Sequence, residues 1–221
     1  MKIGIVGING RIGKILSTLI AKEELSGGIS SATSPRELEN VISESDVLID
    51  FSAPAALHRI IDVAAQYKTP IVSGTTDFSD KDFERIREIS RIIPILHSSN
   101  FSLGVQLMAI LVRKCAQILP DFDFGIIERH HNRKKDAPSG TALFLAQQIS
   151  KEAQIVSLRE GNIFGEHICD FVGEHEMISI CHRAFDREVF ASGAIKCARW
   201  LVGKHPKLYS MQDYLNSVGS I

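Results

Sequence analysis

The stretch Ile3–Gly13, IGIVGINGRIG, places a short apolar run directly before three glycines in the pattern G-x-x-G-x-x-G. The run at 3–6 predicts a buried strand, and the pattern from about 11 to 22 predicts a helix. In such a unit the first glycine permits a sharp turn and the second lets backbone N–H groups approach a pyrophosphate. The third lets the helix pack closely on the strand. The stretch therefore favours dinucleotide binding over a purely structural turn.

The first hundred residues repeat this alternation of short apolar runs and longer helical patterns. Helices are expected to begin near Pro54 and at Ser79, where a serine and early acidic residues form a cap. Further strands are expected at 29–33, 47–50, 71–73 and 92–96. Strands that alternate with helices predict a parallel sheet covered on both faces.

After Asn100 the pattern changes to that of an α+β unit. The residue patterns predict helices at 102–118 and from Ser139 to about Glu152, and strands at 124–128, 168–172 and 176–183. The Gly173-Glu174 step between the last two strands suggests a hairpin. A final helix at 188–202 and a capping signal at Ser210-Met211-Gln212-Asp213 close the chain.

Composition excludes several classes of protein. The 221 residues carry a net charge of −1, so no global positive field is available to hold nucleic acid. No apolar run reaches the roughly 18 to 20 residues that a membrane helix needs. The four cysteines form no C-x-x-C pair and have no zinc-finger spacing with histidine. We expect a cytoplasmic protein with no metal, nucleic-acid or membrane site.

Two further loops are candidates for cofactor contacts because they follow predicted strands. They are Gly74-Thr75-Thr76 and Ser98-Ser99-Asn100-Phe101. In open α/β sheets, ligands bind at the carboxyl ends of strands, where these small and hydroxylated residues would lie. The segment 30–36 contains hydroxyls and one arginine but no carboxylate, which favours a 2′-phosphate and hence NADPH over NADH.

The stretch 127–141, IERHHNRKKDAPSGT, concentrates two histidines and four cations before a helix start. It could be a solvated loop. His130 and His131 are adjacent and point in opposite directions on an extended chain, so they do not suit one metal. If the loop doubles back, Lys134 and His130 could contact the same substrate molecule. Ser139-Gly140-Thr141 presents free N–H groups suited to a carboxylate. Together these groups suit reduction of an anionic C=N or C=C substrate, with a side chain as the acid.

This stretch resembles the E-x-H-H-x-x-K-x-D-A-P-S-G-T-A signature of the dihydrodipicolinate reductase family. The resemblance extends to other segments across nearly the whole chain: 6–13, 50–52, 74–76, 100–105, 165–167, Arg187 with 190–194, and 209–211. It implies NAD(P)H-dependent reduction of 4-hydroxy-tetrahydrodipicolinate, a cyclic dicarboxylate, in lysine and diaminopimelate biosynthesis. It also implies an α/β fold with a Rossmann-type dinucleotide-binding domain at 1–101 and 187–221. A smaller α+β domain for substrate binding and homotetramer assembly would occupy 102–186.

The resemblance also assigns roles to individual residues. It implies that His130 is the proton donor and Lys134 the second catalytic group. The substrate contacts would be His131, Ser139, Gly140 and Thr141. The cofactor contacts would be Gly7, Ile8, Asn9, Gly10, Arg11, Ile12, Gly74, Thr75, Thr76, Ser98, Ser99, Asn100 and Phe101.

Two departures from the family pattern stand out, because the segment after the second strand and the connection between Gly161 and Gly165 are both short. The first leaves the choice between NADH and NADPH open. Two other functions compete with the reductase. The first is another nicotinamide enzyme with a similar domain pair, such as an amino-acid or semialdehyde dehydrogenase, and a semialdehyde enzyme would need a nucleophilic cysteine facing the nicotinamide. The second is a nucleotide-sensing module, which would have no use for the His130 and Lys134 pair.

Overall fold

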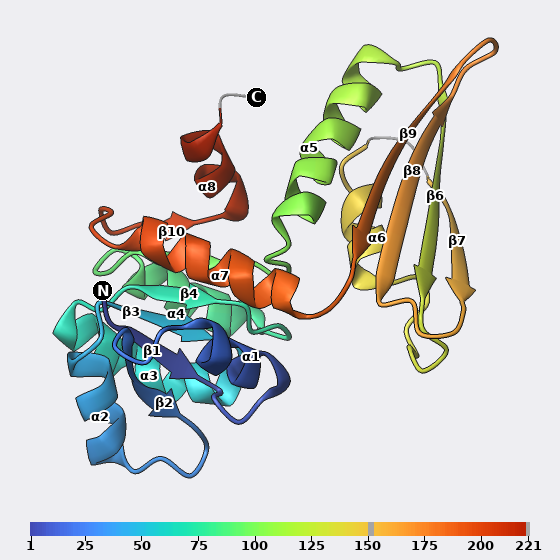
Figure 1. Ribbon diagram of the computed structural model, residues 1–221. Helices are drawn as coiled ribbons and strands as arrows, with labels where there is room; N and C mark the ends of the chain where they lie inside the picture. Colours follow the sequence, from blue (N-terminus) through green and yellow to red (C-terminus); the bar gives the residue numbers. More distant parts are fainter. Residues whose placement is uncertain (150–152, 220–221) are drawn as a thin grey trace. The chain divides into compact units, whose positions relative to one another are not determined.

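The computed structural model describes residues 1–149 and 153–219, and it divides into two compact units. Unit 1 combines Met1–Phe101 with Phe190–Ile221, and unit 2 consists of Ser102–Val189 (Figure 1). The chain returns to unit 1 at position 190 rather than 187. This boundary falls in the first turn of helix α7 (Glu188–Leu201).

Unit 1 contains a six-stranded sheet in the order β10-β5-β4-β3-β1-β2, in which every neighbouring pair is parallel. Its strands are β1 (Ile3–Val6), β2 (Leu25–Ile29), β3 (Val47–Asp50), β4 (Ile71–Ser73), β5 (Ile95–His97) and β10 (Leu208–Tyr209). All residues of β1, β3 and β4 are buried, which explains why these strands are nearly continuous apolar runs.

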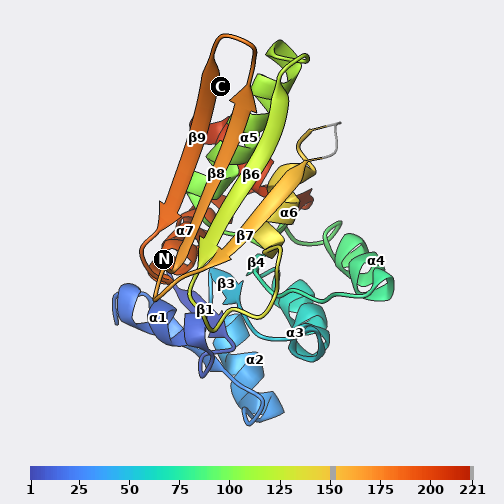
Figure 2. The same cartoon turned by 90° about the vertical axis from the view of Figure 1, so that its right-hand side faces the viewer.

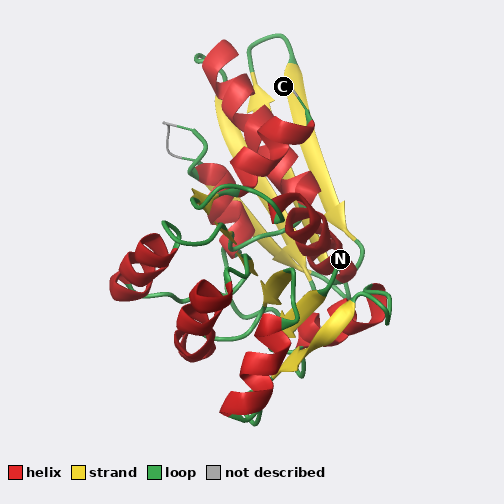
Figure 3. Cartoon of the chain, turned by 90° about the vertical axis from the view of Figure 1, so that its left-hand side faces the viewer, coloured by secondary structure: helices red, strands yellow, loops and turns green. Residues whose placement is uncertain are grey.

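Helices cover both faces of this sheet (Figures 2 and 3). Three of them, α2 (Pro35–Ser43), α3 (Pro54–Tyr67) and α4 (Asp80–Ile89), share one core with the strands. The opposite face carries α1 (Arg11–Leu19) and α7, and α8 (Met211–Val218) ends the described chain. The expected Rossmann-type arrangement of a parallel sheet between two helical layers is confirmed.

Several elements of unit 1 differ from the sequence expectations. Helix α1 ends at Leu19 instead of 22, strand β5 spans Ile95–His97 instead of 92–96, and strand β10 was not anticipated. The second strand ends at Ile29 instead of beginning there, because Gly27 and Gly28 lie inside it. A Cβ at Gly28 would lie 2.1 Å from the side chain of Ile8, so this glycine permits a close approach and does not mark a turn. Helix α2 was not anticipated, although Ser34 forms a capping box with Glu37 at its start.

Unit 2 is a four-stranded mixed sheet in the order β7-β6-β8-β9, with α5 (Leu103–Ile118) and α6 (Gly140–Ala146) on one face (Figure 1). The strands are β6 (Asp123–His130), β7 (Gln154–Arg159), β8 (Gly165–Val172) and β9 (Met177–Ala184). Strand β7 runs parallel to β6, and the other pairs are antiparallel. The expected second α+β unit is therefore confirmed.

The boundaries in unit 2 are less predictable than those in unit 1. The expected hairpin is present, since the N–H of Gly173 donates to the carbonyl of Glu176 at 2.9 Å between β8 and β9. Strand β7 was missed. Helix α6 ends at Ala146, and its expected end at Glu152 lies outside the described residues. Within the described chain, no helix is both long enough and apolar enough to span a membrane.

Candidate active site

The buried face of strand β6 carries the most concentrated set of functional groups in unit 2. Side chains alternate along a strand, so Phe124, Ile126, Glu128 and His130 share the face that packs against α5 and α6. The apolar pair lies within the core, and the polar pair lies at the carboxyl end of the strand. Glu128 is fully buried and His130 is 8 % exposed.

The carboxylate of Glu128 organises this end of the strand. It accepts two hydrogen bonds from the guanidinium of Arg159, at 3.1 and 2.8 Å, and one from the backbone N–H of Ser139 at 3.2 Å. Its Oε2 also bonds Nδ1 of His130. Burial raises the pKa of Glu128, but the hydrogen bonds from Arg159, Ser157 and His130 outweigh it and lower the pKa to about 2. Glu128 is therefore an anion at any working pH.

His130 is held by one ring nitrogen, and the other lies beside Gly165. A Cβ at Gly165 would lie 3.1 Å from Nε2 of His130, so a larger residue there would crowd that edge of the ring. Burial lowers the pKa of His130, Glu128 opposes this, and the charges of Lys134 and Arg159 lower it further. The free protein therefore has a mainly neutral imidazole at pH 7, and nearby anions would favour its protonated form.

A second histidine packs edge-on against the first. The rings of His167 and His130 have their centroids 5.2 Å apart. Burial, followed by the charge of His130, lowers the pKa of His167 to about 4, so this ring is neutral. Its Nε2 lies 3.1 Å from Oγ of Ser139, which also accepts the N–H of Ala142 and caps α6.

The loop between β6 and α6 brings Lys134 close enough for its charge to act on His130. Lys134 Nζ lies 2.9 and 2.8 Å from the two carboxylate oxygens of Asp136. Arg133 donates to Asn162 at 3.3 Å and so ties this loop to the one before β8. Lys135 is exposed.

The expected substrate contacts lie around the same loop. His131 is half-buried, and within the described chain its Nδ1 is buried without a hydrogen-bond partner. Gly140 is exposed, and nothing lies within 4 Å of the position that its Cβ would take. Thr141 follows in the first turn of α6. Ser139 differs from the expectation, because its hydroxyl and N–H are already used by the cap and by Glu128.

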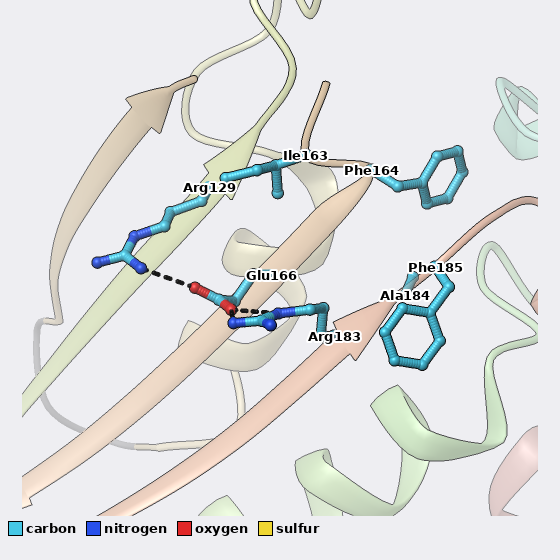
Figure 4. Close-up of a pocket in the computed structure, with 7 residues that line it drawn as sticks. All are labelled: Arg129, Ile163, Phe164, Glu166, Arg183, Ala184 and Phe185. Atoms are coloured by element: carbon cyan, nitrogen blue, oxygen red, sulfur yellow. Dashed lines mark hydrogen bonds and ion pairs between the residues drawn. The ribbon is translucent and has the colours of Figure 1, made fainter. Parts of the chain in front are cut away.

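Arg129, which the sequence left without a role, belongs to the opposite face of the sheet (Figure 4). Its Nη1 lies 3.0 Å from the buried carboxylate of Glu166, which also accepts a hydrogen bond from Nε of Arg183 at 2.6 Å. These residues line a cavity of about 320 Å³ with Phe164 and Phe185. None of the predicted site residues lines this cavity.

In unit 1 the glycine loop has the geometry that a dinucleotide requires. Gly7 has φ +81°, a conformation that favours glycine. A Cβ at Gly13 would lie 2.1 Å from the carbonyl oxygen of Gly7, so only glycine lets α1 begin this close to β1. Gly10 is the N-cap of α1, and no side chain caps this helix. Ile8 and Asn9 lie between these glycines, and Arg11 and Ile12 form the first turn of α1. These residues fit a pyrophosphate at the helix start.

The other predicted cofactor loops lie at the same carboxyl edge of the sheet, because β1, β4 and β5 are parallel. The loop 74–76 follows β4 and the loop 98–101 follows β5. Not every side chain in them is accessible. The hydroxyl of Thr75 is buried and donates to Asp50 at 2.9 Å. Phe101 is buried against Phe51, with ring centroids 5.6 Å apart.

Asp50 holds the first of these loops, 74–76, in place. Burial raises the pKa of this carboxyl group, and hydrogen bonds from Ser52, Ser73 and Thr75 oppose the rise. The bonds from Ser73 and Thr75 measure 2.8 and 2.9 Å. Asp50 therefore fixes the ends of β3 and β4 where the cofactor loops begin.

Sequence reasoning gave no role to Glu128, Arg159 or His167. Glu128 could have been found, because it stands two residues before His130 on a predicted strand and so shares its face. Arg159 and His167 enter the site only through strand pairing, opposite His130 and Glu128 respectively. The family resemblance includes 165–167 and so marks His167, but no signal in the local sequence marks Arg159.

Three of the four cysteines do not suit nucleophilic catalysis. Burial raises the pKa of Cys169 and of Cys197 to about 12, which is the opposite of what a reactive thiolate needs. Burial also raises the pKa of Cys115. This argues against the semialdehyde dehydrogenase alternative.

Comparison with known proteins matches both units to one family. The family model "Dihydrodipicolinate reductase, N-terminus" matches residues 1–101, and "Dihydrodipicolinate reductase, C-terminus" matches residues 104–215. The 4-hydroxy-tetrahydrodipicolinate reductase of Caldanaerobacter subterraneus subsp. tengcongensis is 39 % identical, covering 94 % of this chain and 95 % of its own. The same-named protein of Rickettsia akari is 38 % identical, covering 98 % and 97 %.

A solved structure shares the fold. The dipicolinate-bound dihydrodipicolinate reductase from Paenisporosarcina sp. TG-14 has a TM-score of 0.80 at 22 % identity, covering 95 % of this chain and 97 % of its own. The family resemblance inferred from the sequence is thus confirmed: the chain belongs to the dihydrodipicolinate reductase family.

Proposed function

We propose that this protein reduces 4-hydroxy-tetrahydrodipicolinate to tetrahydrodipicolinate with a nicotinamide cofactor. In this reaction one water leaves the substrate, and one hydride and one proton are added. The observation that carries the proposal is the pair of His130 and Glu128, a buried imidazole with Nδ1 held by a carboxylate and Nε2 beside a glycine. The names of the relatives support the choice of substrate.

His130 is the proton donor in this proposal. The bound cofactor supplies the hydride. The hydrogen bond from Nδ1 to Glu128 leaves Nε2 to carry the proton that is given to the substrate. Burial disfavours the protonated ring in the free protein, but the two carboxylates of the substrate would favour it. His130 therefore takes up its proton when the substrate is bound and can then donate that proton to it.

Lys134 and the start of α6 bind and orient the substrate. Lys134 is 22 % exposed and paired with Asp136, so it can turn toward a carboxylate that offers a stronger contact. Gly140 is exposed and has no neighbour within 4 Å of the position that its Cβ would take, so a carboxylate can approach the start of α6 there. We assign these roles to Lys134, His131, Gly140 and Thr141, and only a capping role to Ser139.

We further propose that the cofactor lies along the carboxyl edge of the unit 1 sheet, with its pyrophosphate at the start of α1. NADPH is preferred over NADH, since the loop after β2 contains no carboxylate to bind a free ribose hydroxyl. The four free cysteines support a location in the reducing cytoplasm.

We also propose that the protein assembles as a homotetramer through unit 2. The face of its sheet away from α5 and α6 exposes apolar side chains, including Val156, Val172 and Met177. An exposed apolar sheet face of this kind suits contact with another copy. Light scattering after size exclusion tests this, and a monomeric mass at micromolar concentration would contradict it.

Turnover of freshly made 4-hydroxy-tetrahydrodipicolinate, followed as loss of nicotinamide absorbance, tests the proposed reaction. Parallel assays with NADH and NADPH compare the two cofactors. We expect consumption that depends on both substrates and is faster at low NADPH than at equally low NADH. Cofactor binding with no consumption would point instead to a nucleotide-sensing module.

A further inference from the structure

A cavity of about 270 Å³ opens at the carboxyl edge of unit 1, beside the glycine loop and the start of α3. Gly7, Ser30, Ser31 and Ser52 contribute to its wall, which is otherwise mostly apolar. Among the described residues that line it, only Arg59 carries a charge. The cavity lies at the ends of β1, β2 and β3, where the strand order reverses and this type of sheet receives its ligand.

Arg59 projects from the second turn of α3 to the loop after β2. Its Nη2 donates to the carbonyl oxygen of Thr33 at 2.8 Å. Its Nη1 lies 3.4 Å from the carbonyl oxygen of Ser31 and 3.5 Å from that of Ser30. A guanidinium has five N–H groups, and these contacts use at most three of them. The guanidinium of Arg59 therefore brings a fixed positive charge to the loop, and it has N–H groups left to donate to a further acceptor.

No carboxylate balances this charge at the loop. Residues 30–34 are Ser, Ser, Ala, Thr and Ser, and the first acidic residue is Glu37. The carboxylate of Glu37 is committed to the cap of α2, where it accepts the N–H of Ser34 at 3.0 Å and its hydroxyl at 2.7 Å. An anionic group that enters the cavity beside Ser30 and Ser31 would meet hydroxyls and a guanidinium, without a competing acid.

We propose that Arg59 is the residue that selects NADPH, by binding the 2′-phosphate of the adenosine ribose. In dinucleotide-binding sheets the residue that contacts this ribose follows the second strand, and an arginine there can bind the 2′-phosphate. Here the arginine that the sequence places after β2, Arg36, lies in the first turn of α2 and does not line the cavity, and α3 supplies the guanidinium instead. The planar guanidinium can pair with two phosphate oxygens at once. This inference rests on the proposed use of a nicotinamide cofactor.

Binding of two small nucleotides by calorimetry tests the proposal without any turnover. Adenosine 2′,5′-bisphosphate and adenosine 5′-monophosphate differ only by the 2′-phosphate. We expect the wild-type protein to bind the bisphosphate about 10- to 100-fold more tightly, the scale of a charge-assisted contact. Arg59→Gln should abolish most of this difference and leave binding of the monophosphate nearly unchanged, and Arg59→Lys should restore part of it.

Arg36→Gln is the matched control. Arg36 is an exposed arginine in the first turn of α2, near the same loop, and it does not line the cavity. This variant should keep the wild-type ratio. The proposal is overturned if Arg59→Gln keeps the ratio, if Arg36→Gln loses it, or if the wild-type protein binds both nucleotides equally.

Two other outcomes identify different errors. If Arg59→Gln weakens both nucleotides equally, Arg59 only braces the loop through the carbonyls of Ser31 and Thr33, and the assignment as a phosphate reader is wrong. If the wild-type protein binds neither nucleotide, the proposed cofactor site itself is wrong. Thermal unfolding of each variant checks that the fold is retained.

Discussion

Replacing Glu128 by glutamine should change the pH dependence of the reaction. Glu128 is fully buried, its pKa is about 2, and its Oε2 bonds Nδ1 of His130. Glutamine keeps the size and removes the charge. The protonated form of His130 then loses its anionic partner, while the charges of Lys134 and Arg159 still oppose protonation. The pKa of His130 must therefore fall.

The size of this fall follows from the strength of the contact. A hydrogen bond to a charged group is worth about 1.5–3 kcal/mol, and about 1.4 kcal/mol corresponds to one pKa unit. The pKa of His130 should drop by about one to two units. A reaction that needs protonated His130 slows as pH rises through this pKa, so the decline moves to lower pH. At pH 8 kcat/KM should be about 10- to 100-fold below wild type, and the gap should narrow toward pH 5.

The assay is kcat/KM for the cyclic substrate between pH 5 and pH 9, at saturating cofactor. The matched control is Glu166→Gln, because Glu166 is also a buried carboxylate held by arginines but lies on the opposite face of the sheet from His130. Both variants should unfold at a lower temperature, and only Glu128→Gln should shift the profile. An equal loss of rate at every pH would refute the reasoning and leave Glu128 a purely structural residue.

Four further predictions concern single groups. His130→Gln should lower kcat by roughly 10²- to 10⁴-fold with cofactor affinity unchanged by fluorescence titration, and wild-type kcat would remove His130 as the acid. Lys134→Ala should lower kcat/KM about 10- to 100-fold in steady-state assays, and an unchanged value would exclude Lys134 from the mechanism. Gly13→Ala should lower the free energy of unfolding in urea by about 1–3 kcal/mol, because the new Cβ would lie 2.1 Å from a carbonyl oxygen. Gly125→Ala should not lower it, because nothing lies within 4 Å of the new Cβ. Because folding lowers the pKa of Glu128 from 4.5 to about 2, its ionised carboxylate adds on the order of 3 kcal/mol to the free energy of unfolding above pH 4.5, and this stabilisation is lost as pH falls toward 2. The free energies of unfolding of wild type and Glu128→Gln should therefore converge in acid. A difference between them that stays constant with pH would contradict this.

The sequence predicted unit 1 better than unit 2, for a physical reason. Strands β1, β3 and β4 are buried on both faces, so each appears as an apolar run between helices, and their bounds were predicted correctly. Strand β7 lies at the edge of its sheet and is only partly buried. Its six residues therefore contain no continuous apolar signal, and it was missed.

By itself, the sequence determined the alternation of strands and helices in the first hundred residues, the glycine loop and the family signature that contains His130 and Lys134. These features are local: each depends on residues within about fifteen positions of one another. Tertiary structure alone decided what surrounds them. Arg159 reaches Glu128 across 31 positions, and Arg59 reaches the loop after β2 across 26 to 29. Pairing of distant strands and helices creates such contacts. The effect of Arg159 on the pKa of His130, and the positive charge that Arg59 brings to the cavity beside the glycine loop, therefore could not be read from the sequence.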